Sequence, residues 1–86
     1  MLKRVVDIIS SQPYNGSDSA ATRGFNAVNG WLAKDARREV VRAEDPYGHP
    51  DDPQDRFTAT LIWPDDDDKA MVDLERCMNE QSVRLK

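Results

Sequence analysis

Carboxylates are the residues of this 86-residue chain whose type and spacing could do chemistry. From Glu44 to Asp68 the chain carries nine acidic residues and one basic residue, Arg56. Such a concentration could supply general acids and bases, could hold a hard cation, or could bind a basic protein surface. The neighbours of these acids, and the elements that carry them, decide between the three roles.

The residues that could cooperate with the acids are few. The only histidine, His49, stands beside Pro50, Asp51 and Asp52, where it could act as a base or ligate a metal ion. The calcium-loop pattern D-x-[DN]-x-[DN]-G with a closing glutamate is absent, so we interpret His49 as a solvated loop residue. The only cysteine, Cys77, falls on the apolar face of a predicted helix, where an unreactive thiol is the usual outcome. The sequence therefore predicts no enzyme, no metal site and no cofactor.

Hydrophobic spacing predicts the elements that must position the acids. Residues 2–10 are rich in β-branched side chains, which favours a strand, although the same letters fit a short amphipathic helix. Residues 12–18 contain the turn dipeptide Asn15-Gly16 and precede a helix. We expect strands at residues 2–10, 37–44, 56–63 and 82–86, and helices at residues 19–36 and 65–81.

Two of these elements have well-defined apolar faces. The first helix places Ala21, Phe25, Val28 and Leu32 on one stripe, with Trp31 beside it. The third strand turns Phe57, Ala59, Leu61 and Trp63 to one side. Gly24 and Gly30 each weaken a helix by about 1 kcal/mol relative to alanine. We therefore expect these glycines to let a strand approach the first helix closely.

The order strand, helix, strand, strand, helix, strand resembles that of a ferredoxin-like fold. We predict a single small α+β domain over residues 1–86, built as a two-layer sandwich with the βαββαβ pattern. If residues 2–10 form a helix instead, the alternative is an ααββα arrangement with a two- or three-stranded antiparallel sheet. Many unrelated functions use this fold, so it implies no activity.

Composition limits the compartment and the partners. One cysteine excludes an internal disulfide and a multi-cysteine zinc site. Asp7 interrupts the first apolar run, and no stretch approaches 18 apolar residues, so we expect no signal peptide, no membrane span and a cytoplasmic location. Residues 1–42 carry a net charge of +3 and residues 43–86 a net charge of −7. That imbalance, and the missing RNA-binding pattern in residues 56–63, argue against direct nucleic-acid binding.

The acids form two groups with different explanations. Residues 65–68 are four aspartates at a predicted helix start, where each is favoured by the helix dipole by about 0.3–1 kcal/mol. Residues 45–55 form an acidic, proline-rich loop of eleven residues, which is long for a hairpin. Prolines reduce the entropy that such a loop loses when it is ordered against a partner. The loop is therefore the stronger candidate for binding.

We expect a non-enzymatic protein-binding module whose acids occupy a basic, nucleic-acid-binding surface of a partner protein and so inhibit it. In size and charge it resembles small antagonists of host defence from phages or mobile elements. The residues expected to bind the partner are Asp45, Asp51, Asp52, Asp55, Asp65, Asp66, Asp67 and Asp68. The alternative is a homo-oligomeric ferredoxin-like domain whose charge serves only solubility, with Trp31, Val40 or Ile62 in the contact.

Overall fold

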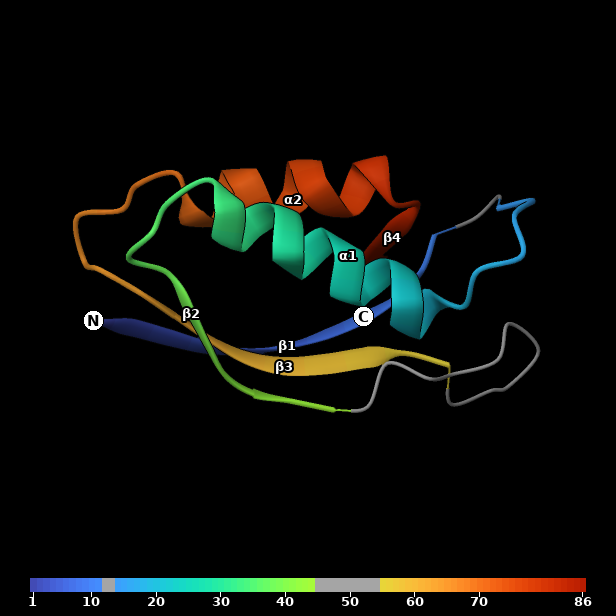
Figure 1. Cartoon of the computed structure of the whole chain (residues 1–86), viewed down its shortest axis with the longest axis horizontal. Coiled ribbons are helices and arrows are strands. Elements are labelled where there is room, and N and C mark those ends of the chain that lie inside the picture. The colour runs from blue at the N-terminus through green and yellow to red at the C-terminus, as the bar shows by residue number, and fades with distance from the viewer. Residues whose placement is uncertain (12–13, 45–54) are drawn as a thin grey trace.

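The computed structural model describes residues 1–11, 14–44 and 55–86. Its elements are β1 (Leu2–Ser10), α1 (Ala20–Ala33), β2 (Glu39–Ala43), β3 (Phe57–Trp63), α2 (Ala70–Glu80) and β4 (Val83–Leu85). The four strands form one antiparallel sheet in the order β2-β3-β1-β4, and both helices lie on the same face of it (Figure 1). The structure therefore confirms a small α+β domain with two helices and a four-stranded sheet.

The first segment of the chain is a strand near the middle of the sheet. β1 pairs with β3 over residues 2–8 and with β4 over residues 8–10. The prediction of a strand at residues 2–10 is thus confirmed, and the ααββα alternative is wrong. The density of β-branched side chains suits this position, because such side chains pack well on a pleated surface.

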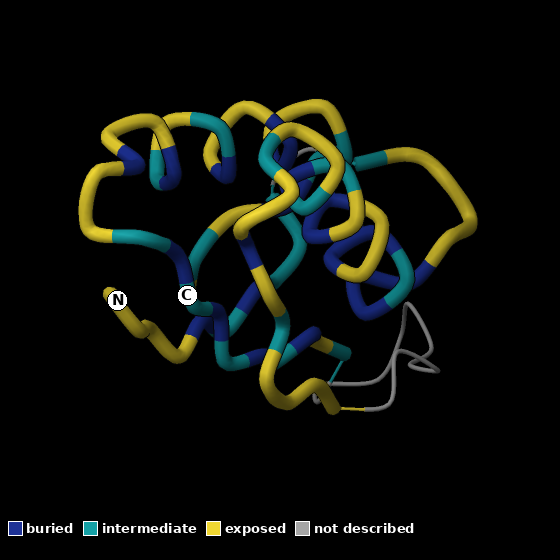
Figure 2. Tube along the Cα trace, turned by 60° about the vertical axis from the view of Figure 1, so that its left-hand side comes forward, coloured by how far each residue is buried: buried dark blue, intermediate teal, exposed yellow. Residues whose placement is uncertain are grey.

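β3 supplies the centre of the core. Its burial alternates strictly, and the four predicted inward residues are all buried: Phe57, Ala59, Leu61 and Trp63. They pack against buried positions of β1 and of both helices. Figure 2 shows the same division, with exposed turns of the helices on the outside and buried turns directed towards the sheet. The face of the sheet opposite the helices carries no further layer among the described residues (Figure 1).

Helix α1 differs from its prediction in length and in its buried stripe. It begins after Ser19, whose hydroxyl accepts a hydrogen bond from Thr22 N at 3.0 Å, and it ends at Ala33 rather than residue 36. Phe25 is 41% exposed, whereas Trp31 is fully buried and donates from Nε1 to Ala70 O at 2.7 Å. The stripe is therefore rotated towards Trp31. Gly24 behaves as predicted, because a Cβ there would lie 2.6 Å from Phe57 Cβ.

Helix α2 begins at Ala70, so the prediction that residues 65–68 form its first turn is wrong. These residues make successive tight turns, with Asp67 N donating to Pro64 O at 3.0 Å and Ala70 N donating to Asp67 O at 3.3 Å. The reason is the side chain of Asp67, which points into the molecule towards Arg38. The buried stripe of α2 contains Ala70, Leu74, Cys77 and Met78.

Within the described part of the chain, no helix combines the length and the apolar character needed to cross a membrane.

Candidate functional site

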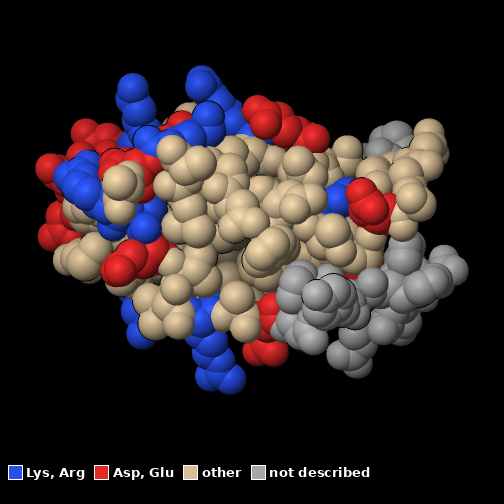
Figure 3. Space-filling view, viewed as in Figure 1, with Lys and Arg blue, Asp and Glu red and all other residues tan. Residues whose placement is uncertain are grey.

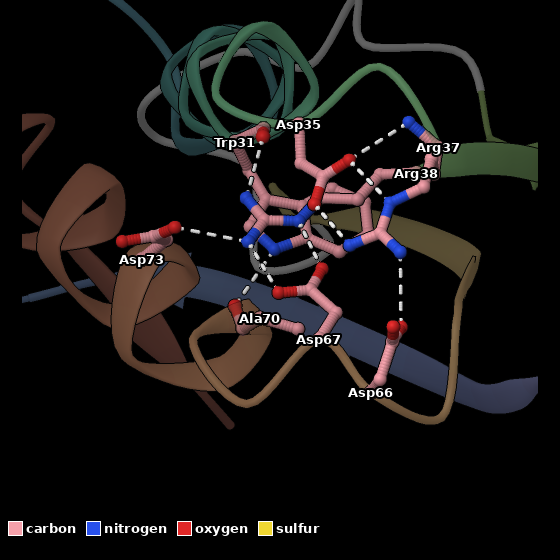
Figure 4. A network of polar contacts seen from close by, with 8 residues as sticks. All are labelled: Trp31, Asp35, Arg37, Arg38, Asp66, Asp67, Ala70 and Asp73. Atoms are coloured by element: carbon pink, nitrogen blue, oxygen red, sulfur yellow. Dashed lines mark hydrogen bonds and ion pairs between the residues drawn. The ribbon is translucent and has the colours of Figure 1, made fainter.

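The aspartates of residues 65–68, here called the acidic turn, are anchored by a buried ion pair. Arg38 donates from Nε to Asp67 Oδ2 at 2.7 Å and from Nη2 to Asp67 Oδ1 at 3.1 Å (Figure 4). The two side chains are only 1% and 4% exposed. Such bidentate geometry is the strong form of an arginine–carboxylate contact. Asp67 is therefore part of the framework and is not available to a partner.

The remaining donors of Arg38 complete this network. Its Nη2 also contacts Asp73 Oδ2 at 2.9 Å, and its Nη1 donates to Trp31 O at 2.9 Å (Figure 4). The hydrogen bonds between Arg38 and Asp67 lower the pKa of Asp67 and raise the pKa of Arg38. The network joins the end of α1, the acidic turn and the first turn of α2, so its chemistry is structural.

Two further acids of the turn also face cations of this chain. Asp66 Oδ1 accepts from Arg37 Nη1 at 2.9 Å, and Asp65 Oδ1 lies 3.0 Å from the Met1 amino group. Arg37 also binds Asp35, and its hydrogen bonds lower the pKa of Asp35 to about 2. Figure 3 shows the result, with red and blue atoms intermixed at the left-hand end of the molecule. The charge of the acidic turn is largely matched within the chain.

Asp55, another predicted site residue, does not join the acidic turn. Asp55 lies just before β3 and accepts hydrogen bonds from Ala20 N at 2.8 Å and Ala21 N at 3.0 Å. It therefore caps the N-terminus of α1, at the opposite end of β3 from residues 65–68. The predicted site residues Asp45, Asp51 and Asp52 lie outside the described residues, as does His49. Those expectations remain predictions.

Two further candidates for a reactive site are the Cys77 thiol and a cluster of metal-binding side chains. The Cys77 thiol is buried, and loss of hydration raises its pKa, which opposes formation of the nucleophilic thiolate. Among residues 1–11, 14–44 and 55–86, no group of three or more His, Cys, Asp or Glu side chains could hold a metal ion.

A different feature lies at the edge of the sheet, where strand β4 is short. β4 pairs with β1 only over residues 8–10, and the flanking bonds run from Lys86 N to Asp7 O at 2.8 Å and from Ser11 N to Ser82 O at 2.9 Å. On the β4 side of residues 2–6, no described residue pairs with β1. We call these five residues the free edge of β1.

The backbone of the free edge presents unpaired groups. In a strand, the N–H and C=O groups of one residue point to the same side, and the side alternates from residue to residue. Asp7 and Ser11 both direct their backbone groups to β4. Lys3 and Val5 therefore direct theirs to the free edge, which offers two N–H and two C=O groups to an added strand.

An apolar groove adjoins the free edge. It has a volume of about 320 Å³ and lies between α2 and the helix-facing side of β4. Its lining residues are Met71, Val72, Glu75, Met78, Asn79, Val83, Arg84 and Leu85. We call it the α2–β4 groove. At the free edge itself, Val5 is 64% exposed and Leu2 is also exposed; Met1 before it and Val72 on α2 are exposed as well. The groove meets β1 on the helix-facing side of the sheet, where Arg4 contacts Met71 at 3.9 Å, whereas Val5 lies on the uncovered face.

The opposite edge of the sheet is protected in a way that the free edge is not. β2 contains a register shift between Val40 and Arg42, which leaves Val41 outside the regular pairing and exposed. Such bulges hinder the addition of another strand. The register of β1 is regular over residues 2–8. The two edges therefore differ in their capacity to accept a partner.

The uncovered face of the sheet holds a second hollow of about 290 Å³, lined by Val5, Arg42, Glu44, Thr58, Ala59 and Thr60. Its mixed polar lining is what water-facing sheets normally carry.

Two of the three residues expected at the contact of a homo-oligomer pack in or against the core of the domain. Trp31 is fully buried, and Val40 packs against the core. Ile62 is the member of that set on the uncovered face, opposite Lys3.

Sequence reasoning missed the free edge, although one signal was available. The first predicted strand is nine residues long and the last is short, so the two cannot cover each other completely. The acidic residues were predicted to bind a partner instead, whereas Asp55 and Asp67 accept hydrogen bonds from other residues of this chain. Searches of family models, of curated proteins and of solved structures gave no match to this chain, so its function is inferred from the geometry above.

Proposed function

We propose that this chain is a non-enzymatic protein-binding domain, and that its partner adds a strand to the free edge of β1. We also propose that the frame is ferredoxin-like. The order βαββαβ, the antiparallel pairing of all neighbours and the placement of both helices on one face support this assignment. The fold itself implies no function, so the proposal depends on the edge.

The observation that carries the proposal is the half-filled position beside β1. β4 occupies only the part next to residues 8–10, so a strand-sized gap remains beside residues 2–6. Exposed strand edges are usually blunted or covered, since they otherwise pair with other chains. The α2–β4 groove meets the gap where Met71 contacts Arg4 at 3.9 Å, and it can take apolar side chains of an added strand. Backbone hydrogen bonds would provide affinity and the groove would provide selectivity.

The test compares two variants of Val5, whose N–H lies on the free edge. Val5→Pro removes this N–H without disturbing the pairing with β3, and Val5→Thr keeps it. A library of displayed random peptides is selected on the immobilised full chain, and the dissociation constants of the selected peptides are measured for each variant. We expect Val5→Pro to weaken binding at least tenfold and Val5→Thr to leave it within about twofold. Equal binding by both variants, or no peptide that binds below about 1 mM, would refute the proposal.

A second candidate function retains the acidic turn. Asp65 and Asp66 are 76% and 77% exposed although each contacts a cation, and Asp68 is also exposed. The buried Asp67 holds these three carboxylates on a fixed turn, from which they could bind a basic protein surface as an inhibitor. The matched cations nearby make this the weaker candidate.

The second candidate predicts salt-sensitive capture. The full chain is passed over an immobilised lysine-rich peptide at about 50 and about 500 mM salt, which shortens the Debye length roughly threefold. Retention should fall with salt and should be lost when Asp65, Asp66 and Asp68 are all replaced by asparagine. Retention that ignores both changes would eliminate this candidate.

A further inference from the structure

The chemistry of the free edge of β1 specifies which strand it accepts. This inference rests on the proposed function and goes further by naming the partner. We propose that the partner is an extended segment of another protein that carries two adjacent acidic residues flanked by apolar ones, paired antiparallel to β1.

The charges of the free edge carry the first step. Lys3 and Arg4 are exposed, and neither forms an ion pair with a described acid; Arg4 contacts only the sulfur of Met71. Successive side chains of a strand point to opposite faces, so these two cations lie one on each face of the sheet. Directly opposed residues of paired strands interact most strongly, and opposite charges there are favourable. The partner residues opposite Lys3 and Arg4 are therefore acidic.

The apolar neighbours give the rest of the pattern. Leu2 and Val5 are exposed, and Val6 is buried on the helix-facing side of the sheet. An antiparallel partner meets these residues in reverse order, from Val6 to Leu2. Its sequence is thus apolar, apolar, acidic, acidic, apolar. The direction follows from the sheet, in which every described neighbour is antiparallel and the partner continues the position of β4.

The same charges disfavour a second copy of this chain as the occupant. Two copies of β1 paired antiparallel around a two-fold axis would bring Lys3 and Arg4 of both copies together. Like charges opposed across strands are destabilising. Cations at a strand edge also have a purely protective role, because they hinder pairing with other chains in general. The binding role and the protective role differ in one respect, because only in the binding role do acidic residues of the partner strengthen the complex.

The experiment uses ten-residue peptides and the full chain. One peptide carries the pattern above with two glutamates, a second has both glutamates replaced by glutamine, and a third has both replaced by lysine. Fluorescence anisotropy measures their dissociation constants for the wild type and for the charge-reversed variant Lys3→Glu/Arg4→Glu. The control Lys34→Glu/Arg76→Glu makes the same change in net charge at exposed positions outside the free edge.

We expect the wild type to bind the glutamate peptide at least fivefold more tightly than the glutamine peptide. The charge-reversed variant should prefer the lysine peptide by a similar factor, and the control should behave as the wild type. If the glutamate and glutamine peptides bind equally and Val5→Pro weakens both, this inference is wrong while the proposed function stands. If no designed peptide binds while the selected peptides still lose affinity with Val5→Pro, the inference alone is wrong. If Val5→Pro has no effect on any peptide, both are wrong. A concentration-dependent dimer that Val5→Pro dissociates would make a second copy the occupant and would overturn the inference.

Discussion

Replacing Asp67 by asparagine removes one charge from the most buried ion pair of the described chain and leaves the size of the side chain unchanged. Arg38 then keeps Asp73 at 2.9 Å and Trp31 O at 2.9 Å, but its two contacts to Asp67 lose their charge. The amide also places a donor where the guanidinium needs an acceptor. The variant therefore tests how much a buried arginine depends on this carboxylate.

The structure sets the expected magnitude. Removing one partner of a buried ion pair destabilises a protein by about 3–5 kcal/mol, because the other charge is left without compensation. Asp73 still compensates Arg38 in part, so we expect the lower end, about 3 kcal/mol. The folding free energy of a small domain is about 5–15 kcal/mol, so this loss is a large share. It corresponds to a fall of roughly 12–24 °C in Tm, at about 4–8 °C per kcal/mol.

Urea unfolding followed by tryptophan fluorescence measures the effect, since Trp31 and Trp63 both lie in the core. The matched control is Asp68→Asn, which makes the same substitution one residue away on an exposed side chain. We expect the control to change the free energy of unfolding by less than about 0.5 kcal/mol. If Asp67→Asn were no more destabilising than Asp68→Asn, the ion pair would contribute nothing net and the account of the acidic turn as framework would be wrong.

Three further predictions concern stability. Arg37 lowers the pKa of Asp35 to about 2, and Arg38 lowers the pKa of Asp67, so both carboxylates stabilise the fold above pH of about 4, and this stability is lost as the pH falls towards 2. In urea titrations between pH 5 and pH 2, the free energy of unfolding should decline less steeply for Asp35→Asn than for the wild type. An equally steep decline in both would contradict the assignment. Asp55→Ala should destabilise by about 1–2 kcal/mol in the same assay through loss of the cap on α1, whereas the exposed control Asp18→Ala should be near neutral. Ser82 has a φ of 55°, so Ser82→Gly should raise the free energy of unfolding by up to about 1 kcal/mol and Ser82→Val should lower it.

The elements of the fold could be predicted wherever a periodic pattern was strong. β3 alternates apolar and polar residues from Phe57 to Leu61, and its burial alternates along its whole length, as the pattern predicted. The start of α2 was misjudged because residues 65–68 have the composition of a helix N-terminus. The competing interaction was the ion pair between Asp67 and Arg38, and their sequence separation of 29 positions hides it from any local pattern.

The candidate site could be predicted less well for the same reason. The role of Asp55 depends on an amide 35 residues earlier in the chain, and the burial of Trp31 depends on a carbonyl 39 residues later. The free edge depends on how much of β1 is left uncovered, which is a property of the assembled sheet. Periodicity places side chains on faces, but it does not say which backbone edges remain unpaired.

The cap that Asp55 places on α1 has a consequence for the order in which the domain can form. The first amides of a helix ordinarily fray, since nothing inside the helix accepts their hydrogen bonds. Here the acceptor is a side chain at the entry to β3, so the first turn of α1 is completed only after the chain has reached residue 55 and β3 has docked. Helix α1 and strand β3 should therefore open and close together as one cooperative unit, and the amides of Ala20 and Ala21 should exchange with solvent at the rate of the sheet.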